Sequence, residues 1–553
     1  MISSDISSTP VTTQINESTN TRSSRSDYKS IQSFVLFLVL AMALCISIIF
    51  RLSNLEKREY YIDEALTSLN VAGYTYKNVS LLQPGYRIIQ AGELSCYQTV
   101  NRSPGKCLTA LAKNGGEHPP LYFLLSWCWQ KVFSNDIFSM RLLPALLSLS
   151  SFPFIYCLCL ELFRKPGDLD KTVAGTTAVI ATCIAALSPF QLLYSQYARE
   201  YSLWFALTAL SSWQFLRSVR TGNAISWLNY SVATTLSLYT HPLSVAVAAG
   251  QFLYSFVISK FKVTELLKQQ TVALSAAAFM FSPWALQMAI NKQASDEMLK
   301  WLERKVPLQS LVETWLKNTG HLYFQIPDLD KILIALACLI ILGGFVTLWV
   351  KCKKQFFFVL TLVLSGLLPM ALPDLAFGGV RSQTPRYLIP AILGLLIPTA
   401  FLFALLVSQK LRTIRTIGSS LLAGFLALEL LSCAYISGAA DHPELPMHGV
   451  CPREIAQVVN KADSPLIICP IGRKYMSYML TLSHYLKPNV ALLVCSSDAI
   501  PAMPGAYQTL FIFNPSLECF TRFQRDPHFQ IEELANIKTL WLMRYSGPTV
   551  ARY

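Results

Sequence analysis

The sequence predicts a polytopic α-helical membrane protein of about eleven transmembrane helices, followed by a small α/β domain outside the membrane. Of the 553 residues, 53% are hydrophobic and only 14% are charged, and the mean hydropathy is +0.40. Apolar runs of roughly 18 to 25 residues, each long enough to cross a bilayer core, recur between Ile31 and Gly438. This composition excludes a pair of ordinary soluble domains, in which about a quarter of the residues are charged.

Residues 1–30 are rich in Ser, Thr and Asn and contain almost nothing that a core could bury, so they are predicted to form a disordered cytoplasmic tail. The apolar run from Ile31 to Phe50 is longer than the hydrophobic region of a signal peptide and lacks a small-residue cleavage site. It is therefore predicted to be retained as the first span.

The basic residues lie mainly at the ends of spans, and by the positive-inside rule their clusters face the cytoplasm. The predicted spans are 31–51, 139–163, 172–193, 200–217, 224–240, 242–259, 271–290, 330–350, 355–373, 386–408 and 414–438. This topology predicts a transmembrane domain over 31–438, with the loop 52–138 and a C-terminal domain over 439–553 on the outer face. The formal net charge of +14 then reflects topology and contact with membrane lipids. It does not indicate a nucleic-acid partner, because the cations form no patch interleaved with aromatic residues.

The apolar stretch from His118 to Phe133 is too short for a span, and counting it as one would place the basic cluster at Arg164 outside. Its tyrosine and tryptophan residues favour a helix lying along the outer membrane interface.

The C-terminal segment alternates strand and helix patterns, which predicts a small α/β domain with a largely parallel sheet. Strands are predicted at 465–469, 490–495, 509–513 and 539–543, and helices at 453–462 and 473–486. The segment has no glycine-rich phosphate loop. The fourteen cysteines form no zinc-binding pattern, and disulfides among those outside the spans are left open.

Four groups of polar residues on the predicted outer side are candidates for chemistry. Asp63 and Glu64 follow the first span, where a carboxylate can act as a general base or bind a divalent cation, although a solvated acidic pair is the simpler interpretation. His118 precedes two prolines at a helix entry, a place that suits a phosphate or an ordinary surface histidine.

The third group comprises Arg199, Glu200 and Arg386 at the mouths of spans, flanked by tyrosines. An arginine at membrane depth usually has a phosphate or carboxylate partner, but Arg199 has Glu200 and the headgroups as alternatives. His241, the fourth candidate, precedes a proline in a turn, where a histidine is commonly structural.

In their order along the chain, these pieces resemble the membrane glycosyltransferases of the GT-C superfamily, in the bacterial branch related to protein O-mannosyltransferases (glycosyltransferase family 39) and to lipid A aminoarabinose transferases. The resemblance covers roughly residues 31 to 438. The matching pieces are Ile62-Asp63-Glu64-Ala65, Glu117-His118-Pro119-Pro120-Leu121-Tyr122, Arg141-Leu142-Leu143-Pro144, Leu187-Ser188-Pro189-Phe190, Tyr194-Ser195-Gln196-Tyr197-Ala198-Arg199-Glu200-Tyr201, Tyr239-Thr240-His241 and Pro385-Arg386-Tyr387.

The resemblance implies an inverting transfer of sugar from a polyprenyl-phosphate donor to a lipid, glycan or protein acceptor on the outer face of a bacterial inner membrane. It implies that Asp63 is the general base and that Glu64 orients the acceptor or assists a cation. It implies phosphate binding by His118, Arg199, Arg386 and Tyr387. The candidates for contact with the acceptor or the sugar are Tyr61, Tyr122, Tyr194, Gln196, Glu200 and His241.

No cofactor is certain, and a divalent metal ion is left open because the turn before Arg199 has Gln196 but no Asp, whereas some relatives place a second carboxylate there. Two other functions compete with the transferase. One is a transporter or flippase of lipid-linked glycans, which the lack of paired inverted repeats disfavours. The other is a glycan ligase or polymerase, which would use a diphosphate-linked donor.

Overall fold

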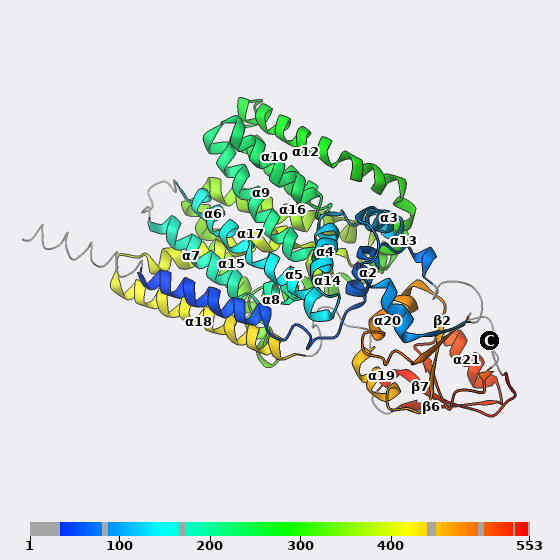
Figure 1. Ribbon diagram of the computed structural model, residues 1–553. Helices are drawn as coiled ribbons and strands as arrows, with labels where there is room; N and C mark the ends of the chain where they lie inside the picture. The colour runs from blue at the N-terminus through cyan, green and yellow to red at the C-terminus, as the bar shows by residue number, and fades with distance from the viewer. Residues whose placement is uncertain are drawn as a thin grey trace, which may run out of the picture.

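The computed structural model describes residues 34–79, 87–164, 172–439, 450–495, 503–534 and 537–550. The tail predicted over 1–30 therefore lies outside the described residues. Within them, a bundle of long helices adjoins a smaller domain that contains a six-stranded sheet (Figure 1). The predicted fold class, a helical membrane protein with a C-terminal α/β domain, is confirmed.

Helices occupy all eleven positions at which spans were predicted. They are Phe34–Leu52, α5 (Ile137–Leu149) with α6 (Ser151–Leu162), α7 (Thr172–Leu187) with α8 (Pro189–Ser195), α9 (Tyr201–Thr221), α10 (Ala224–Leu238), α11 (Ser244–Ile258), α12 (Glu265–Ile290), α15 (Asp330–Lys351), α16 (Lys353–Phe377), α17 (Ile389–Val407) and α18 (Arg412–Gly438).

Not all of these helices are long and apolar enough to cross a membrane. Among the described residues seven are, or eight if α7 and α8, bent by 57° at their junction, form one span. The helices α10 and α11 have 15 residues each, which at 1.5 Å per residue gives about 22 Å against a bilayer core of about 30 Å. The count of eleven spans stays a prediction.

The helix α17 lies at the centre of the bundle, with 78% of its span window buried. Two glycines let its neighbours approach it closely, as small residues commonly do between membrane helices. A Cβ on Gly344 of α15 would lie 2.5 Å from the Pro398 carbonyl oxygen, and one on Gly366 of α16 would lie 2.5 Å from the Ala391 nitrogen. Larger side chains at these two positions would therefore push α15 and α16 away from α17.

Shorter helices connect the long ones. They are α2 (Ile62–Val71), α3 (Pro104–Gly115), α4 (Leu121–Val132), α13 (Lys292–Leu299) and α14 (Leu308–His321). The helix α4 begins directly after the two prolines and has 12 residues, so a short helix exists where an interfacial one was predicted. Its position at the membrane surface stays a prediction.

The sheet of the smaller domain has the strand order β1-β3-β2-β5-β7-β6. Its strands are β1 (Arg87–Gln90), β2 (Pro465–Pro470), β3 (Ala491–Cys495), β5 (Thr509–Phe513), β6 (Phe529–Leu534) and β7 (Ile537–Tyr545), and a separate pair joins β4 (Met503–Pro504) to β8 (Thr549–Val550). The helices of this domain are α19 (Pro452–Val459), α20 (Arg473–Leu482) and α21 (Leu517–Arg525).

The prediction of a largely parallel sheet was wrong, because the sheet is mixed. Only β3, β2 and β5 run parallel to one another, while β1, β7 and β6 pair antiparallel with their neighbours. Two residues separate β6 from β7 in the sequence, and a connection that short joins antiparallel strands only.

The edge strand β1 comes from the loop after the first helix, not from the C-terminal segment. Its residues Arg87 to Gln90 pair with Val494 to Ala491 of β3. One buried apolar cluster also combines Tyr60, Ala65 and Leu69 of this loop with Met479 and Leu482 of α20. The loop and the C-terminal segment thus share a sheet and a core, with α2 beside α20 (Figure 1). All fourteen cysteines lie among the described residues, and all are free thiols.

Candidate functional site

The short helix α2 carries the acidic pair and begins at Ile62, one residue before Asp63. Both carboxylates lie in the first turn, where the exposed N–H groups of a helix favour negative charge. Glu64 also accepts a hydrogen bond of 2.8 Å from the Tyr61 backbone N–H through Oε2, which ties down the start of the helix. The local sequence therefore fixes where this helix starts.

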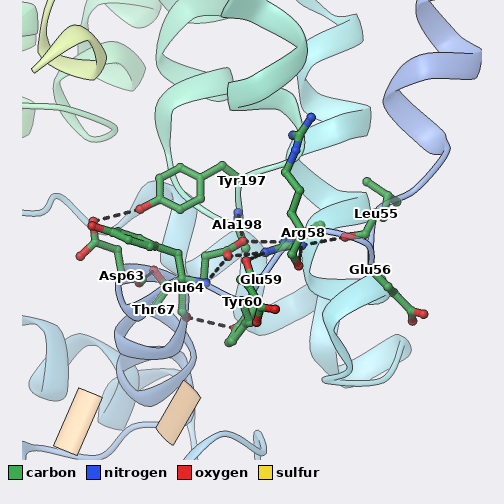
Figure 2. Close-up of polar contacts among 12 residues, drawn as sticks. Leu55, Glu56, Arg58, Glu59, Tyr60, Asp63, Glu64, Thr67, Tyr197 and Ala198 are labelled. Atoms are coloured by element: carbon green, nitrogen blue, oxygen red, sulfur yellow. Dashed lines mark hydrogen bonds and ion pairs between the residues drawn. The ribbon is translucent and has the colours of Figure 1, made fainter. Parts of the chain in front are cut away.

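The Glu64 carboxylate is completely buried and fully hydrogen-bonded within the protein. Arg141 of α5 donates to both oxygens, from Nε to Oε1 at 2.9 Å and from Nη2 to Oε2 at 2.7 Å. The Ala198 backbone N–H donates to Oε1 at 2.9 Å. Together with Tyr61, each oxygen accepts two hydrogen bonds, so Glu64 joins α2, α5 and the turn before α9 (Figure 2).

Asp63 points in a different direction and lines a cavity. Its side chain is 24% exposed, and its Oδ2 accepts a hydrogen bond of 2.9 Å from the Tyr197 hydroxyl (Figure 2). Burial, reinforced by the Asp63 charge, raises the pKa of Tyr197 well above its ordinary value, so this phenol stays protonated as a donor. Arg386 Nη2 lies 3.9 Å from the same oxygen.

A buried cluster of charge lies next to α2. Arg199 donates from Nη1 to Thr67 Oγ1 at 3.1 Å, and its Nε lies 3.3 Å from Glu200 Oε2. His118 Nδ1 lies 3.0 Å from Glu200 Oε1, and its Nε2 lies 3.0 Å from Arg199 Nη2. A histidine that carries its proton on Nδ1 satisfies both neighbours, because it donates to the carboxylate and accepts from the guanidinium.

The pKa values of this cluster follow from burial and pairing. Burial alone would raise the pKa of Glu200, but Arg199 and His118 outweigh it and hold that pKa below its ordinary value. Burial alone would lower the pKa of Arg199, but Glu200, together with Asp63 and the neighbouring tyrosines, outweighs it and the pKa rises. Burial lowers the pKa of His241 to about 3. Arg199 and Glu200 are thus an ion pair at neutral pH, and His241 is uncharged.

Arg386 follows the end of α16 and is 8% exposed. Its Nε has no hydrogen-bond partner among the described residues, and its ion pair with Asp63 is long at 3.9 Å. Its guanidinium carbon lies 5.4 Å from the centre of the Tyr387 ring and 5.8 Å from that of Trp301. Arg386 is therefore a desolvated cation held mainly by aromatic faces.

One cavity of about 370 Å³ brings these groups together. Six of the residues predicted from sequence line it, namely Asp63, His118, Arg199, His241, Arg386 and Tyr387. The apolar part of its wall comes from Pro242, Leu243, Leu299, Leu302, Pro369, Met370 and Pro373. The cavity therefore combines two carboxylates and several cationic or aromatic groups with an apolar surface.

The other six predicted residues do not line this cavity. Gln196 Nε2 donates to the Phe50 and Ser53 carbonyl oxygens, both at 2.8 Å, and so holds the end of the first helix. The side chains of Glu64, Tyr122, Tyr194 and Glu200 are buried, and Tyr61 packs 6.0 Å from the Tyr197 ring. Spacing along the sequence placed these residues near the site but could not say which way they face.

Sequence reasoning missed part of the cavity wall, including Arg381, Trp301 and Glu117. The Arg381 guanidinium donates to Asp374 Oδ1 at 3.3 Å, and Asp374 Oδ2 accepts from the Ser382 N–H at 2.7 Å. Gly379, at φ +149°, allows this contact, because a Cβ there would lie 2.4 Å from both Arg381 and Asp374. The Gly378-Gly379 pair after α16 was the available signal for a tight turn at this wall.

In the described part of the chain, no group of three or more His, Cys, Asp or Glu side chains is placed to hold a metal ion.

The fold resembles that of GT-C membrane glycosyltransferases, and its bundle has an acidic residue after the first helix and arginines near the ends of later ones. The fold is shown by similarity to the crystal structure of ArnT from Cupriavidus metallidurans bound to undecaprenyl phosphate. The TM-score is 0.56 at 10% identity, over 94% of this chain and all of that one. The archaeal oligosaccharyltransferase AglB from Archaeoglobus fulgidus gives a TM-score of 0.50 at 12% identity, over 87% of this chain and 70% of that one.

Sequence relatives agree with the fold. Two undecaprenyl phosphate-α-4-amino-4-deoxy-L-arabinose arabinosyl transferases, from Enterobacter sp. and Pseudomonas aeruginosa, are 23% and 22% identical over 64% and 76% of this chain. The matches span 61% and 72% of those relatives, and only 32% of a third from Pseudomonas savastanoi at 24% identity. No family model matches the chain. The resemblance to GT-C glycosyltransferases is confirmed.

Proposed function

We propose that this protein is a membrane glycosyltransferase that moves a sugar, with inversion, from a polyprenyl-phosphate donor to an acceptor on the outer face of a bacterial inner membrane. The observation that carries the proposal is the cavity in which Asp63 faces Arg386 across 3.9 Å. The relatives named as undecaprenyl-phosphate sugar transferases support the donor class.

Asp63 serves as the general base in this proposal. Tyr197 and Arg386 both contact its Oδ2, which leaves Oδ1 to accept the proton of the acceptor hydroxyl as that oxygen attacks the anomeric carbon. The polyprenyl phosphate then departs from the opposite face of the sugar, which inverts the configuration. Glu64 does not take part in the reaction, because its four hydrogen bonds commit it to the protein.

Arg386 is the principal partner of the donor phosphate in this proposal, because it is the least committed cation of the cavity wall. A desolvated guanidinium that faces the departing phosphate stabilises the charge that develops on it. Arg199 contributes less because Glu200 already neutralises most of its charge, and both ring nitrogens of His118 are taken up by contacts with this pair. The apolar wall accommodates the first isoprene units of the lipid.

The experiment supplies purified protein in lipid with radiolabelled polyprenyl-monophosphate sugars and a membrane extract as acceptor. Asp63→Asn is expected to lose transfer by about a hundredfold or more, as for a lost general base. Asp328→Asn, which alters an exposed carboxylate outside the cavity wall, is the matched control and keeps wild-type activity.

Equal transfer by wild type and Asp63→Asn would remove Asp63 from the mechanism. Transfer only from diphosphate-linked oligosaccharides would replace the proposal with a ligase or polymerase. Movement of labelled lipid between leaflets without transfer would replace it with a flippase.

A further inference from the structure

The segment of residues 56–60 leads from the first helix into α2 and sets where Asp63 lies. Arg141 of α5 donates to three backbone carbonyl oxygens in or directly before this segment, those of Leu55 at 2.8 Å, Arg58 at 3.0 Å and Glu59 at 2.7 Å. These contacts fix only one side of the segment.

The C-terminal domain holds the other side. The Tyr60 backbone N–H donates to the Tyr485 hydroxyl at 3.0 Å. The Tyr60 ring is completely buried and meets the His484 ring edge-on at 4.6 Å between centroids. The Tyr60 hydroxyl donates to the Glu64 carbonyl oxygen at 3.1 Å and also bonds Ser68 Oγ at 2.8 Å. Tyr60 thus connects the C-terminal domain to the first two turns of α2.

Arg453, in the first turn of α19, makes a second set of contacts to the same segment. Its Nη2 donates to the Glu56 carbonyl oxygen at 2.7 Å. Its backbone N–H donates to Glu59 Oε2 at 3.3 Å, and its Nε lies 3.6 Å from Glu59 Oε1. Its guanidinium carbon lies 5.3 Å from the centre of the Tyr485 ring.

We propose that the C-terminal domain is a positioning element for the proposed catalytic carboxylate, acting through Tyr485 and Arg453 on residues 56–60. With Arg141 on one side and these two residues on the other, the segment has one position, and so has Asp63 in the turn that follows. The proposal rests on the proposed function, since it assigns Asp63 a reaction that depends on its exact position. A displacement of about 1 Å at a reacting group is enough to cost on the order of a hundredfold in rate.

Tyr485→Phe tests this role because it removes one hydroxyl and keeps the packed ring. It leaves the Tyr60 N–H without its acceptor, and the start of α2 is expected to loosen. Tyr545→Phe is the matched control, because that hydroxyl donates to the Pro548 carbonyl oxygen within the C-terminal domain. We expect Tyr485→Phe to lower kcat by about tenfold or more with the donor KM changed by less than about twofold, and Tyr545→Phe to change neither.

Hydrogen–deuterium exchange of residues 56–62 is measured on the same full-length proteins. Faster exchange is expected in Tyr485→Phe and in Arg453→Met, but not in Tyr545→Phe. If the wild type transfers no sugar, the proposed function fails. Faster exchange in the first two variants would still show that Tyr485 and Arg453 hold residues 56–60 in place. Unchanged exchange, or an unchanged kcat in an active Tyr485→Phe, would overturn the positioning role.

Discussion

Glu64→Gln is expected to destabilise the fold, although its neighbour Asp63→Asn is expected to leave the fold intact. Each Glu64 oxygen accepts two hydrogen bonds, from Tyr61, Ala198 and Arg141. A glutamine has one acceptor oxygen, so either orientation of its amide points an NH₂ group at two N–H donors. The substitution also leaves the buried Arg141 without its counter-charge.

The expected cost follows from these contacts. Hydrogen bonds to a charged group contribute about 1.5–3 kcal/mol each, and breaking one partner of a buried ion pair costs about 3–5 kcal/mol. These estimates describe the same contacts and are not added, so about 3–5 kcal/mol is expected for Glu64→Gln. A typical total stability is about 5–15 kcal/mol. Asp63→Asn is expected to cost about 1 kcal/mol or less, because its amide oxygen still accepts from Tyr197.

Thermal unfolding of the purified variants in one lipid or detergent measures the difference. Glu64→Gln is expected to unfold at a clearly lower temperature than wild type and to give less folded protein, whereas Asp63→Asn unfolds near the wild-type temperature. A Glu64→Gln protein as stable as the wild type but inactive in transfer would refute the reasoning and place Glu64 in the reaction itself.

Two further predictions concern the phosphate partner and pH. Arg386→Lys is expected to lower kcat/KM for the donor by about tenfold or more, since a shorter ammonium replaces a two-pronged guanidinium, whereas the exposed Arg304→Lys leaves it unchanged. Burial lowers the pKa of His484 to about 4, with Arg141 adding to the effect. In the unfolded chain this histidine has its ordinary pKa of about 6.5, so the unfolded state binds the proton first as the pH falls. The stability of the fold is therefore expected to decrease between about pH 6.5 and pH 4, by up to about 1.4 kcal/mol per pH unit. Thermal unfolding of wild type and His484→Gln at pH 7 and 5 checks this, and equal pH dependence in both would contradict it.

The sequence predicted the positions of the helices because long apolar runs depend mainly on composition. It predicted four strands of the C-terminal domain for a similar reason, since buried β-branched and aromatic runs are local signals. The strand β1 was missed because it has only four residues and is a strand only through its pairing with β3. The association of the loop 52–138 with the C-terminal segment joins residues that lie 382 to 425 positions apart, and one sequence carries no local signal for it.

Half of the predicted site residues line the cavity. The other half do not, because local contacts turn their side chains elsewhere. Gln196 looked like a cavity residue because it lies three positions before Arg199, but its amide turns to the end of the first helix. Glu200 looked like a sugar contact, but it is buried between Arg199 and His118. Polar residue type and spacing identified the correct turns of the chain. The direction of each side chain depended on contacts with residues distant in the sequence.

The two adjacent acids show most clearly what decides such a direction. Successive residues of an α-helix are about 100° apart around its axis, so Asp63 and Glu64 in the first turn of α2 cannot face the same side. Arg141 pairs with Glu64 inside the protein. Asp63 therefore faces Tyr197 and the cavity. The buried pair therefore determines which carboxylate remains available for chemistry, which makes Arg141 a requirement for the site although it does not line the cavity.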